Sequence, residues 1–246
     1  MTGDQGAGAG GTRHVVAMGG GGFSQEPDNP LLDDFVLGLT GAERPRICFL
    51  PTPSGDDRGY VANFYDAFVE RARPSWLPLF NRRDADLRAH LFAQDVIYVG
   101  GGNTANMLAI WRVHGVDAIL REAWERGIVL AGLSAGAICW FSHGVTDSFG
   151  LDLGPLEGGL GLVEGSFCPH YDGEALRRPR YHDLVRDGLP AGWAADDGAA
   201  VHFQGAEPAE AVASRRHARA YRVELVDGSV VERELPTRYL GVTDPS

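Results

Sequence analysis

The chain has 246 residues and a formal net charge of −11, with 44% hydrophobic and 22% charged residues. This length suffices for one large α/β domain with a substantial core. An acidic chain without a basic patch argues against a nucleic-acid-binding surface. No run approaches the ~18 consecutive apolar residues of a membrane span. We therefore expect neither nucleic acid nor membrane as a partner, and we expect a cytoplasmic location.

The two ends of the chain differ in character. Residues 1–13 read MTGDQGAGAGGTR, which lacks the apolar core of a signal peptide and predicts a flexible leader. Residues 14–246 are expected to form a single domain, because no linker, repeat or large change of composition interrupts them. Cys48, Cys139 and Cys168 lie far apart beside apolar residues. That pattern predicts buried free thiols rather than disulfides or a zinc site.

Strand-like and helix-like segments alternate along the first half of the chain. Short apolar runs predict strands within the segments 14–20, 46–54, 75–80, 95–99 and 129–133. Helical spacing of apolar residues predicts helices within 27–39, 59–72, 104–115 and 115–127, the first with Asp28 or Asn29 as its cap. The run after residue 134 also looks helical. Such alternation with almost wholly apolar strands predicts a parallel sheet covered on both faces.

The second half has a different texture. Residues 144–172 are glycine-rich and short-stranded, 174–188 predict a helix, and 192–205 predict two short strands around a turn. Within 218–236, Asp227-Gly228 separates two alternating runs, which is a strong hairpin signal. The predicted fold class is therefore α/β, with a doubly wound, mostly parallel sheet, helices on both faces and a C-terminal β-hairpin.

One serine interrupts the apolar run 129–141, VLAGLSAGAICWF. Residues 132–136 read Gly-Leu-Ser-Ala-Gly, which matches the nucleophile elbow G-x-S-x-G in a strand–turn–helix setting. A turn this tight brings neighbouring backbone close and requires small residues beside the serine. It exposes the hydroxyl at the sheet edge, near the first free N–H groups of the next helix. Ser134 is predicted to be a nucleophile, with helix capping as the alternative.

A nucleophilic serine needs a base, and the base needs an orienting acid. Of the eight histidines, His170 in SFCPHYDGE follows an apolar strand and a proline, at the start of a loop before a helix. We favour it as the base over a structural role. Two acids compete for the third place. Asp147 would give the order Ser–Asp–His, and Asp197, with Asp196 as its less favoured neighbour, the order Ser–His–Asp. Spacing leaves both open, because turn acids often serve only the turn.

The glycine turn VGGGNT at 99–104 is the candidate partner of the elbow. Its glycines let the backbone approach a ligand closely, and Asn103 or Thr104 can cap the following helix. It lacks the Lys-Ser/Thr pair of a P-loop. The N–H groups of Gly102 and Ala135 together would form an oxyanion hole. Histidines and carboxylates show no metal-ligand spacing, so we predict no metal and no cofactor. In parallel sheets ligands sit at the carboxyl ends of the strands. The loops 19–22 and 100–102 are therefore expected at one edge with Ser134.

Four motifs, YVGGGNT, GLSAGA, PHYD and DDG, resemble those of the peptidase E family of serine peptidases. Its members are aspartyl dipeptidases related in fold to the class I glutamine amidotransferases. The resemblance extends over most of residues 14–205. It implies that Ser134 is the nucleophile and His170 the base. It also implies that Gly102 and Ala135 supply the oxyanion hole.

The resemblance also bears on the acid and on the substrate. Better-known members carry Pro-Glu-Gly where this chain has Asp196-Asp197-Gly198, so Asp197 would replace the glutamate; Asp147 matches a second proposed acid. We favour Asp197, because amidotransferase-like folds run nucleophile, histidine, acid. Asn103 and Arg178 are the candidate substrate-binding residues. Arg177, Arg178 and Arg180 either pair with a substrate aspartate or form a solvated helix face.

These observations predict a serine peptidase that hydrolyses short peptides, and the resemblance implies that dipeptides with an N-terminal aspartate are among them. Two alternatives remain. One is a serine hydrolase acting on other amides or esters, and the other is a catalytically silent amidotransferase-like binding module. The expected partner is a small peptide substrate, and the sequence is compatible with a homodimer.

Overall fold

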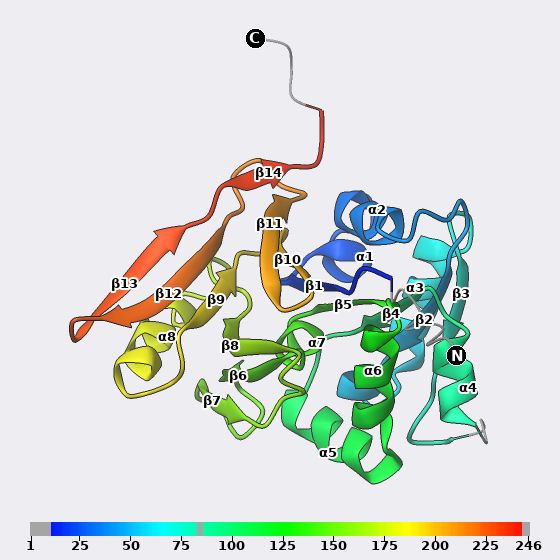
Figure 1. Cartoon of the computed structure of the whole chain (residues 1–246), viewed down its shortest axis with the longest axis horizontal. Helices are drawn as coiled ribbons and strands as arrows, with labels where there is room; N and C mark the ends of the chain where they lie inside the picture. Colours follow the sequence, from blue (N-terminus) through cyan, green and yellow to red (C-terminus); the bar gives the residue numbers. More distant parts are fainter. Residues whose placement is uncertain (1–10, 83–85, 243–246) are drawn as a thin grey trace, which may run out of the picture.

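The computed structural model describes residues 11–82 and 86–242; residues 1–10 of the predicted leader lie outside them. Its large sheet has eight strands, in the order β14-β11-β10-β1-β5-β4-β2-β3 (Figure 1). They are β14 (Thr237–Tyr239), β11 (Glu207–Ala213), β10 (Ala199–Gln204), β1 (His14–Met18), β5 (Val129–Leu133), β4 (Val96–Val99), β2 (Arg46–Leu50) and β3 (Arg73–Trp76). The five strands from β1 to β3 pair in parallel. The predicted parallel sheet is confirmed.

Helices cover both faces of this sheet. In β1, Val15 and Ala17 belong to one apolar core, and Val16 and Met18 to the other, because successive side chains of a strand face opposite sides. The first core includes side chains from α4 (Leu87–Phe92), α5 (Thr104–His114) and α6 (Val116–Glu125), and the second includes side chains from α1 (Gly22–Gln25), α2 (Leu31–Gly38) and α3 (Arg58–Phe68). Figure 1 draws α1 and α2 above β1, and α5 and α6 below β5.

A second sheet forms from the glycine-rich half of the chain. Its order is β13-β12-β9-β8-β6-β7. The strands are β13 (Ser229–Glu234), β12 (Ala220–Val226), β9 (Gly192–Ala195), β8 (Val163–Cys168), β6 (Phe141–Thr146) and β7 (Gly154–Glu157). Helix α8 (Arg177–Arg186) packs on it through Tyr181, Leu184 and Val185. The predicted hairpin is β12–β13, which extends away from the large sheet in Figure 1. The sequence predicted β9, the β12–β13 hairpin and a short-stranded region over 144–172, but it predicted neither β6 nor a separate sheet.

Three local expectations differ from the structure. Helix α7 (Ala135–Ile138) has only four residues before β6 begins at Phe141, whose buried ring stacks on Phe167 at 5.0 Å between centroids. The cap of α2 is Pro30, without a side-chain hydrogen bond, and the amide nitrogen of Asn29 donates to the Ser214 carbonyl. Strand β3 lies at 73–76 rather than 75–80, because Leu79 and Phe80 donate their N–H groups to the Asp56 carboxylate.

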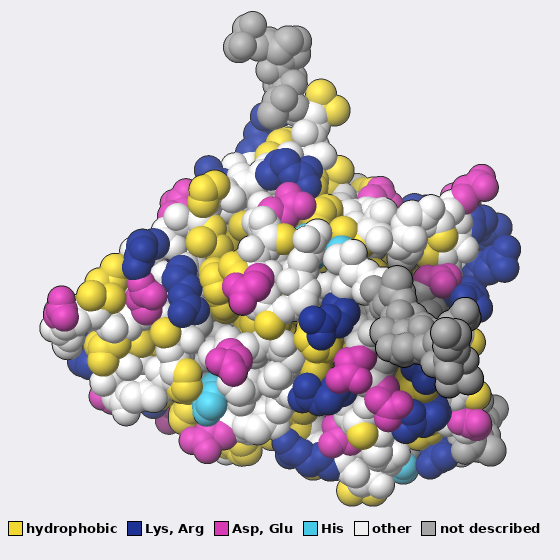
Figure 2. All heavy atoms as spheres, in the orientation of Figure 1, with side chains coloured by type: hydrophobic (Ala, Val, Ile, Leu, Met, Phe, Trp, Pro, Cys, Tyr) yellow, Lys and Arg dark blue, Asp and Glu magenta, His cyan; other side chains and the backbone are white. Residues whose placement is uncertain are grey.

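Charges of both signs are interspersed over the face shown in Figure 2. No helix in the described part of the chain combines the length and the hydropathy needed to cross a membrane.

Two histidines from adjacent strands are buried against each other. His14 Nδ1 lies 2.9 Å from His202 Nε2, and the two rings stack. Burial lowers the pKa of His202 to about 4; the charge of His14 acts in the same direction and that of Glu210 opposes it. The pKa of His14 is also lowered by burial. The folded protein therefore resists protonation of this pair.

This pair predicts a loss of stability in mild acid. The pKa of His202 is about 4 in the folded protein and ~6.5 in the unfolded chain. The neutral side chain therefore makes its full contribution to folding stability above pH 6.5, and that contribution is lost as the pH falls toward 4. Between pH 7 and pH 4.5 the free energy of unfolding of the wild type, measured by urea titration, should fall by about 2–3 kcal/mol more than that of His202→Gln. Equal pH dependence in the two proteins would contradict this assignment.

Candidate active site

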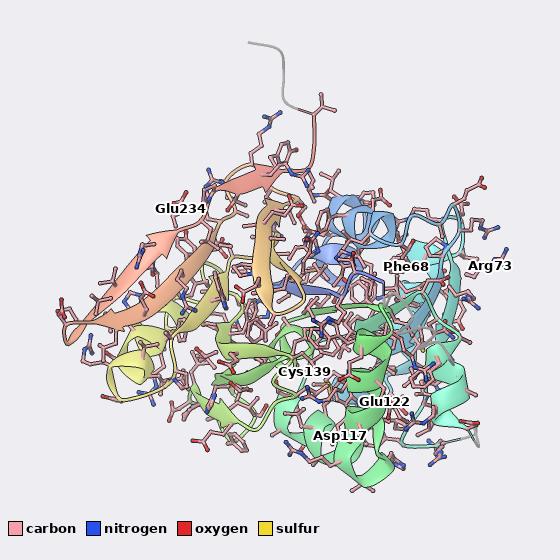
Figure 3. All side chains as sticks on the ribbon, in the orientation of Figure 1. Phe68, Arg73, Asp117, Glu122, Cys139 and Glu234 are labelled. Carbon is pink, nitrogen blue, oxygen red and sulfur yellow. The ribbon has the colours of Figure 1, made fainter. Side chains whose placement is uncertain are left out.

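Ser134 stands at the end of β5 in a strained backbone conformation. Its φ is +53° and its ψ −114°, values that non-glycine residues seldom adopt. Its N–H donates to the carbonyl of Met18 in β1 at 3.1 Å. Of residues 129–141, Ser134 alone is not buried. Cys139, labelled in Figure 3, marks the end of the short helix that follows. The strained turn exposes one hydroxyl at the edge of a buried segment.

The two flanking glycines allow three backbone segments to touch. A Cβ on Gly132 would lie 2.2 Å from the carbonyl oxygen of Gly136, and a Cβ on Gly136 would lie 2.3 Å from the carbonyl oxygen of Val99 in β4. Any side chain at either position would force the elbow apart. The small residues of the motif therefore have a direct steric cause.

His170 lies between Ser134 and Asp197. Its Nε2 is 2.9 Å from the Ser134 Oγ, and its Nδ1 is 2.6 Å from Asp197 Oδ1. His170 also has a positive φ, of +51°, and its N–H donates to the carbonyl of Gly19. An ionised carboxylate can only accept hydrogen bonds, so it assigns the proton to Nδ1 and leaves Nε2 to accept from the serine hydroxyl.

Asp197 is held in the ionised form. The hydrogen bond from His170 keeps the pKa of Asp197 below its usual range; burial opposes this effect, and the nearby charges of His170, Arg215 and Arg177 support it. The Asp197 N–H donates to Asp172 Oδ1 at 2.8 Å. The side chains of His170 and Asp197 are 13% and 21% exposed, so the pair is largely shielded from water.

Two glycines make room for this pair. A Cβ on Gly20 would lie 2.1 Å from Asp197 Oδ1, and a Cβ on Gly173 would lie 2.5 Å from Oδ2 of the same carboxylate. The sequence placed the loop 19–22 at this edge but assigned it no role, and it missed Gly173 and Asp172 altogether. The available signal for Gly173 was its position in the loop directly after His170.

The other two candidate acids lie elsewhere. Asp196 is buried, and its Oδ2 accepts the N–H of Arg219 at 2.8 Å. Burial raises the pKa of Asp196 to about 6. Asp147 is exposed after β6, and within the described ranges neither ring nitrogen of His170 bonds to it. The structure therefore brings Asp197, and not Asp147, to the histidine.

The loop 100–103 runs beside the elbow. The Cβ position of Gly101 lies 3.7 Å from the Ser134 Cβ. Gly102 has a φ of +135°, and a Cβ there would lie 2.2 Å from the carbonyl oxygen of Pro53 in the 3-10 turn η1 (Thr52–Ser54). Among the described residues, no acceptor takes the N–H of Gly102 or that of Ala135. Both predicted oxyanion donors are therefore available to a ligand.

The two predicted substrate-binding residues already have partners. Asn103 caps α5, because its Oδ1 accepts the Asn106 N–H at 2.8 Å; its amide also donates to the Ser148 carbonyl. Arg178 pairs with Glu232, and its guanidinium lies over Tyr171 and Tyr221. Substrate binding by Arg178 stays a prediction, and it would require breaking this ion pair.

The neighbouring arginines of α8 are also engaged. Arg177 is buried and pairs with Glu174, and Arg180 donates to the carbonyl of Leu153. Arg177 and Arg178 are therefore already ion-paired, whereas the Arg180 guanidinium is bonded only through its Nε to a backbone carbonyl in the described part of the chain.

Known proteins resemble this chain in sequence and in fold. Residues 15–210 match the model of peptidase family S51. The chain is 53% identical to "Uncharacterized peptidase YgaJ" of Bacillus subtilis (strain 168) over 233 residues, which cover 93% of this chain and 100% of that protein. Two solved structures share the fold at 18% identity. One is a peptidase from an acI-B1 Actinobacterium, with a TM-score of 0.66; the superposition covers 93% of this chain and 96% of that peptidase. A candidate peptidase E protein from Listeria monocytogenes EGD-e has a TM-score of 0.60, with 91% and 99% covered.

The family match spans both β5 with its serine elbow and the loop that carries His170. The resemblance seen in the four sequence motifs is thereby confirmed. This chain belongs to peptidase family S51, the peptidase E family of serine-type peptidases.

Proposed function

We propose that the protein hydrolyses short peptides, including dipeptides with an N-terminal aspartate, through Ser134, His170 and Asp197. The observation that carries the proposal is the continuous hydrogen-bonded line from the Ser134 Oγ through the His170 ring to Asp197. The aspartyl preference rests on the likeness to peptidase E. Arg177 and Arg178 lend it no support, because both are already paired with carboxylates.

The reaction follows from the geometry. His170 Nε2 accepts the hydroxyl proton as the Ser134 Oγ attacks the substrate carbonyl carbon. The N–H groups of Gly102 and Ala135 donate to the oxygen that becomes negative. His170 then passes the proton to the leaving amine, and the C–N bond breaks to leave an acyl-enzyme on Ser134. A water molecule, deprotonated by His170, hydrolyses the ester and regenerates the hydroxyl.

A substrate panel tests the proposal. We expect the protein to react covalently with a fluorophosphonate probe at Ser134, and to hydrolyse aspartyl-leucine and aspartyl-nitroanilide at least about tenfold faster than alanyl or lysyl counterparts, a discrimination worth ~1.4 kcal/mol. Release of the free amine and the mass of the labelled peptide are the measurements.

The panel separates the alternatives. Labelling of Ser134 with faster cleavage of esters or other amides would retain the serine mechanism and reject the aspartyl preference. Absence of labelling and of hydrolysis, while a small ligand raises the unfolding temperature, would favour a silent binding module and overturn the proposal.

A further inference from the structure

One side chain tethers the loop that carries the oxyanion donor. Gly100 and Asn103 donate their N–H groups to the backbone carbonyls of Leu50 and Pro53, at 3.3 and 2.8 Å. Gly101, between them, donates instead to the hydroxyl of Tyr60 at 3.2 Å. Within the described residues, Gly102 is the one member of this run whose N–H has no acceptor, and Tyr60 is the one side chain that accepts from the run.

We infer that Tyr60 is a positioning residue of the oxyanion hole. By holding the N–H of Gly101, its hydroxyl fixes the orientation of the next peptide group, which carries the Gly102 N–H that the proposed mechanism assigns to the developing oxyanion. This role rests on the proposed function, because it concerns the same site. Tyr60 lies outside the four sequence motifs that predicted the site.

Tyr60 itself is rigidly placed. Its N–H donates to the capping carboxylate of Asp57 at the start of α3. Its ring packs against Phe49 and Phe23, with centroids 5.0 and 5.4 Å apart. Burial raises the pKa of Tyr60, so the phenol stays neutral. An aromatic ring with two torsions, packed on two other rings, makes a stiff support for its hydroxyl.

The loop rests on the rings of Tyr60 and Phe49. A Cβ on Gly100 would lie 2.9 Å from both the Tyr60 and the Phe49 rings, so the loop backbone rests directly on this aromatic pair. Gly100, Gly101 and Gly102 have no side chains with which to anchor themselves. An oxyanion donor must lie about 2.7–3.1 Å from the developing charge, so a small shift of a glycine loop weakens it. The backbone carbonyl tethers cannot be removed by substitution, whereas the hydroxyl of Tyr60 can.

The substitution Tyr60→Phe retains the ring and removes the hydroxyl, which accepts from Gly101 and also bonds to the Ser24 side chain. We expect kcat to fall by about tenfold with KM within about twofold, because complete loss of an oxyanion donor costs ~10²–10³ in turnover and a loosened donor costs part of that. The second-order rate of Ser134 phosphonylation by a fluorophosphonate should fall by a similar factor, since that reaction also builds charge on an oxygen at this site. Both rates are measured on the full chain, well below the unfolding temperature of each variant.

Tyr65→Phe is the matched control. Tyr65 lies on the same helix, and within the described residues its hydroxyl makes no hydrogen bond, so the control should match the wild type in both rates. If Tyr60→Phe also matches the wild type, the tether inference is wrong while the serine mechanism stands. If only KM rises, Tyr60 contacts substrate and the positioning role is overturned. A wild type that is neither labelled nor active would instead overturn the proposed function.

Discussion

Replacing Ser134 by alanine is expected to lower kcat on the best aspartyl substrate by about 10⁶-fold, leaving only the residual catalysis of the oxyanion donors and of substrate binding. The reason is that His170 Nε2 then has no hydroxyl 2.9 Å away to deprotonate, and no acyl-enzyme can form. The variant should also resist fluorophosphonate labelling. Initial rates of amine release and intact-protein mass measure the two effects.

The fold should survive this change. The positive φ at position 134 and the hydrogen bond from its backbone N–H to the Met18 carbonyl both involve the main chain alone. Removing the hydroxyl leaves them in place. The unfolding temperature of Ser134→Ala should therefore stay close to that of the wild type. Ser229→Ala, at an exposed position on the C-terminal hairpin, is the serine control and should keep full activity. Full activity in Ser134→Ala would mean that another nucleophile does the chemistry.

Replacing Asp197 by asparagine is expected to lower kcat by about 10⁴-fold at neutral pH. The side-chain amide can donate to His170 Nδ1, which would place the ring proton on Nε2, the atom that must accept from Ser134. The geometry around the ring should change little, because asparagine is nearly the same size and the Asp172 contact is to the backbone N–H. Steady-state kinetics from pH 6 to pH 9 measure the effect.

Asp147→Asn is the comparison that decides between the two acids. Its side chain is exposed and does not reach His170 in the described part of the chain, so kcat should stay within about twofold of the wild type. A large loss in Asp147→Asn together with a mild loss in Asp197→Asn would reverse the assignment of the third residue.

Much of the architecture was predictable from local patterns. The apolar strands and amphipathic helices up to residue 133 carry their own periodicity, and Asp227-Gly228 adopts the positive φ values, 50° and 78°, that a tight hairpin turn requires. The second sheet was not predictable as a separate layer. Its strands are short, and their partners are set by contacts such as Phe141 on Phe167, which are distant in sequence.

The sequence by itself determined which residues can carry the chemistry. A serine between two glycines after a buried strand, a histidine after Cys-Pro and a glycine loop ahead of a helix are local features with local steric causes. They placed Ser134, His170, Gly102 and Ala135 before any long-range contact was known. The tertiary structure decided how these residues meet.

The Ser134–His170 and His170–Asp197 contacts span 36 and 27 residues, and no local rule distinguishes Asp197 from Asp147 across such intervals. Only the meeting of β1, β5, β10 and the loop after β8 brings Gly20, Asp197 and His170 together. The same packing engages the arginines of α8 and sets Tyr60 under the glycine loop. The physical reason is that local sequence sets the backbone conformation of a turn, whereas side-chain partners depend on which elements the hydrophobic core draws together.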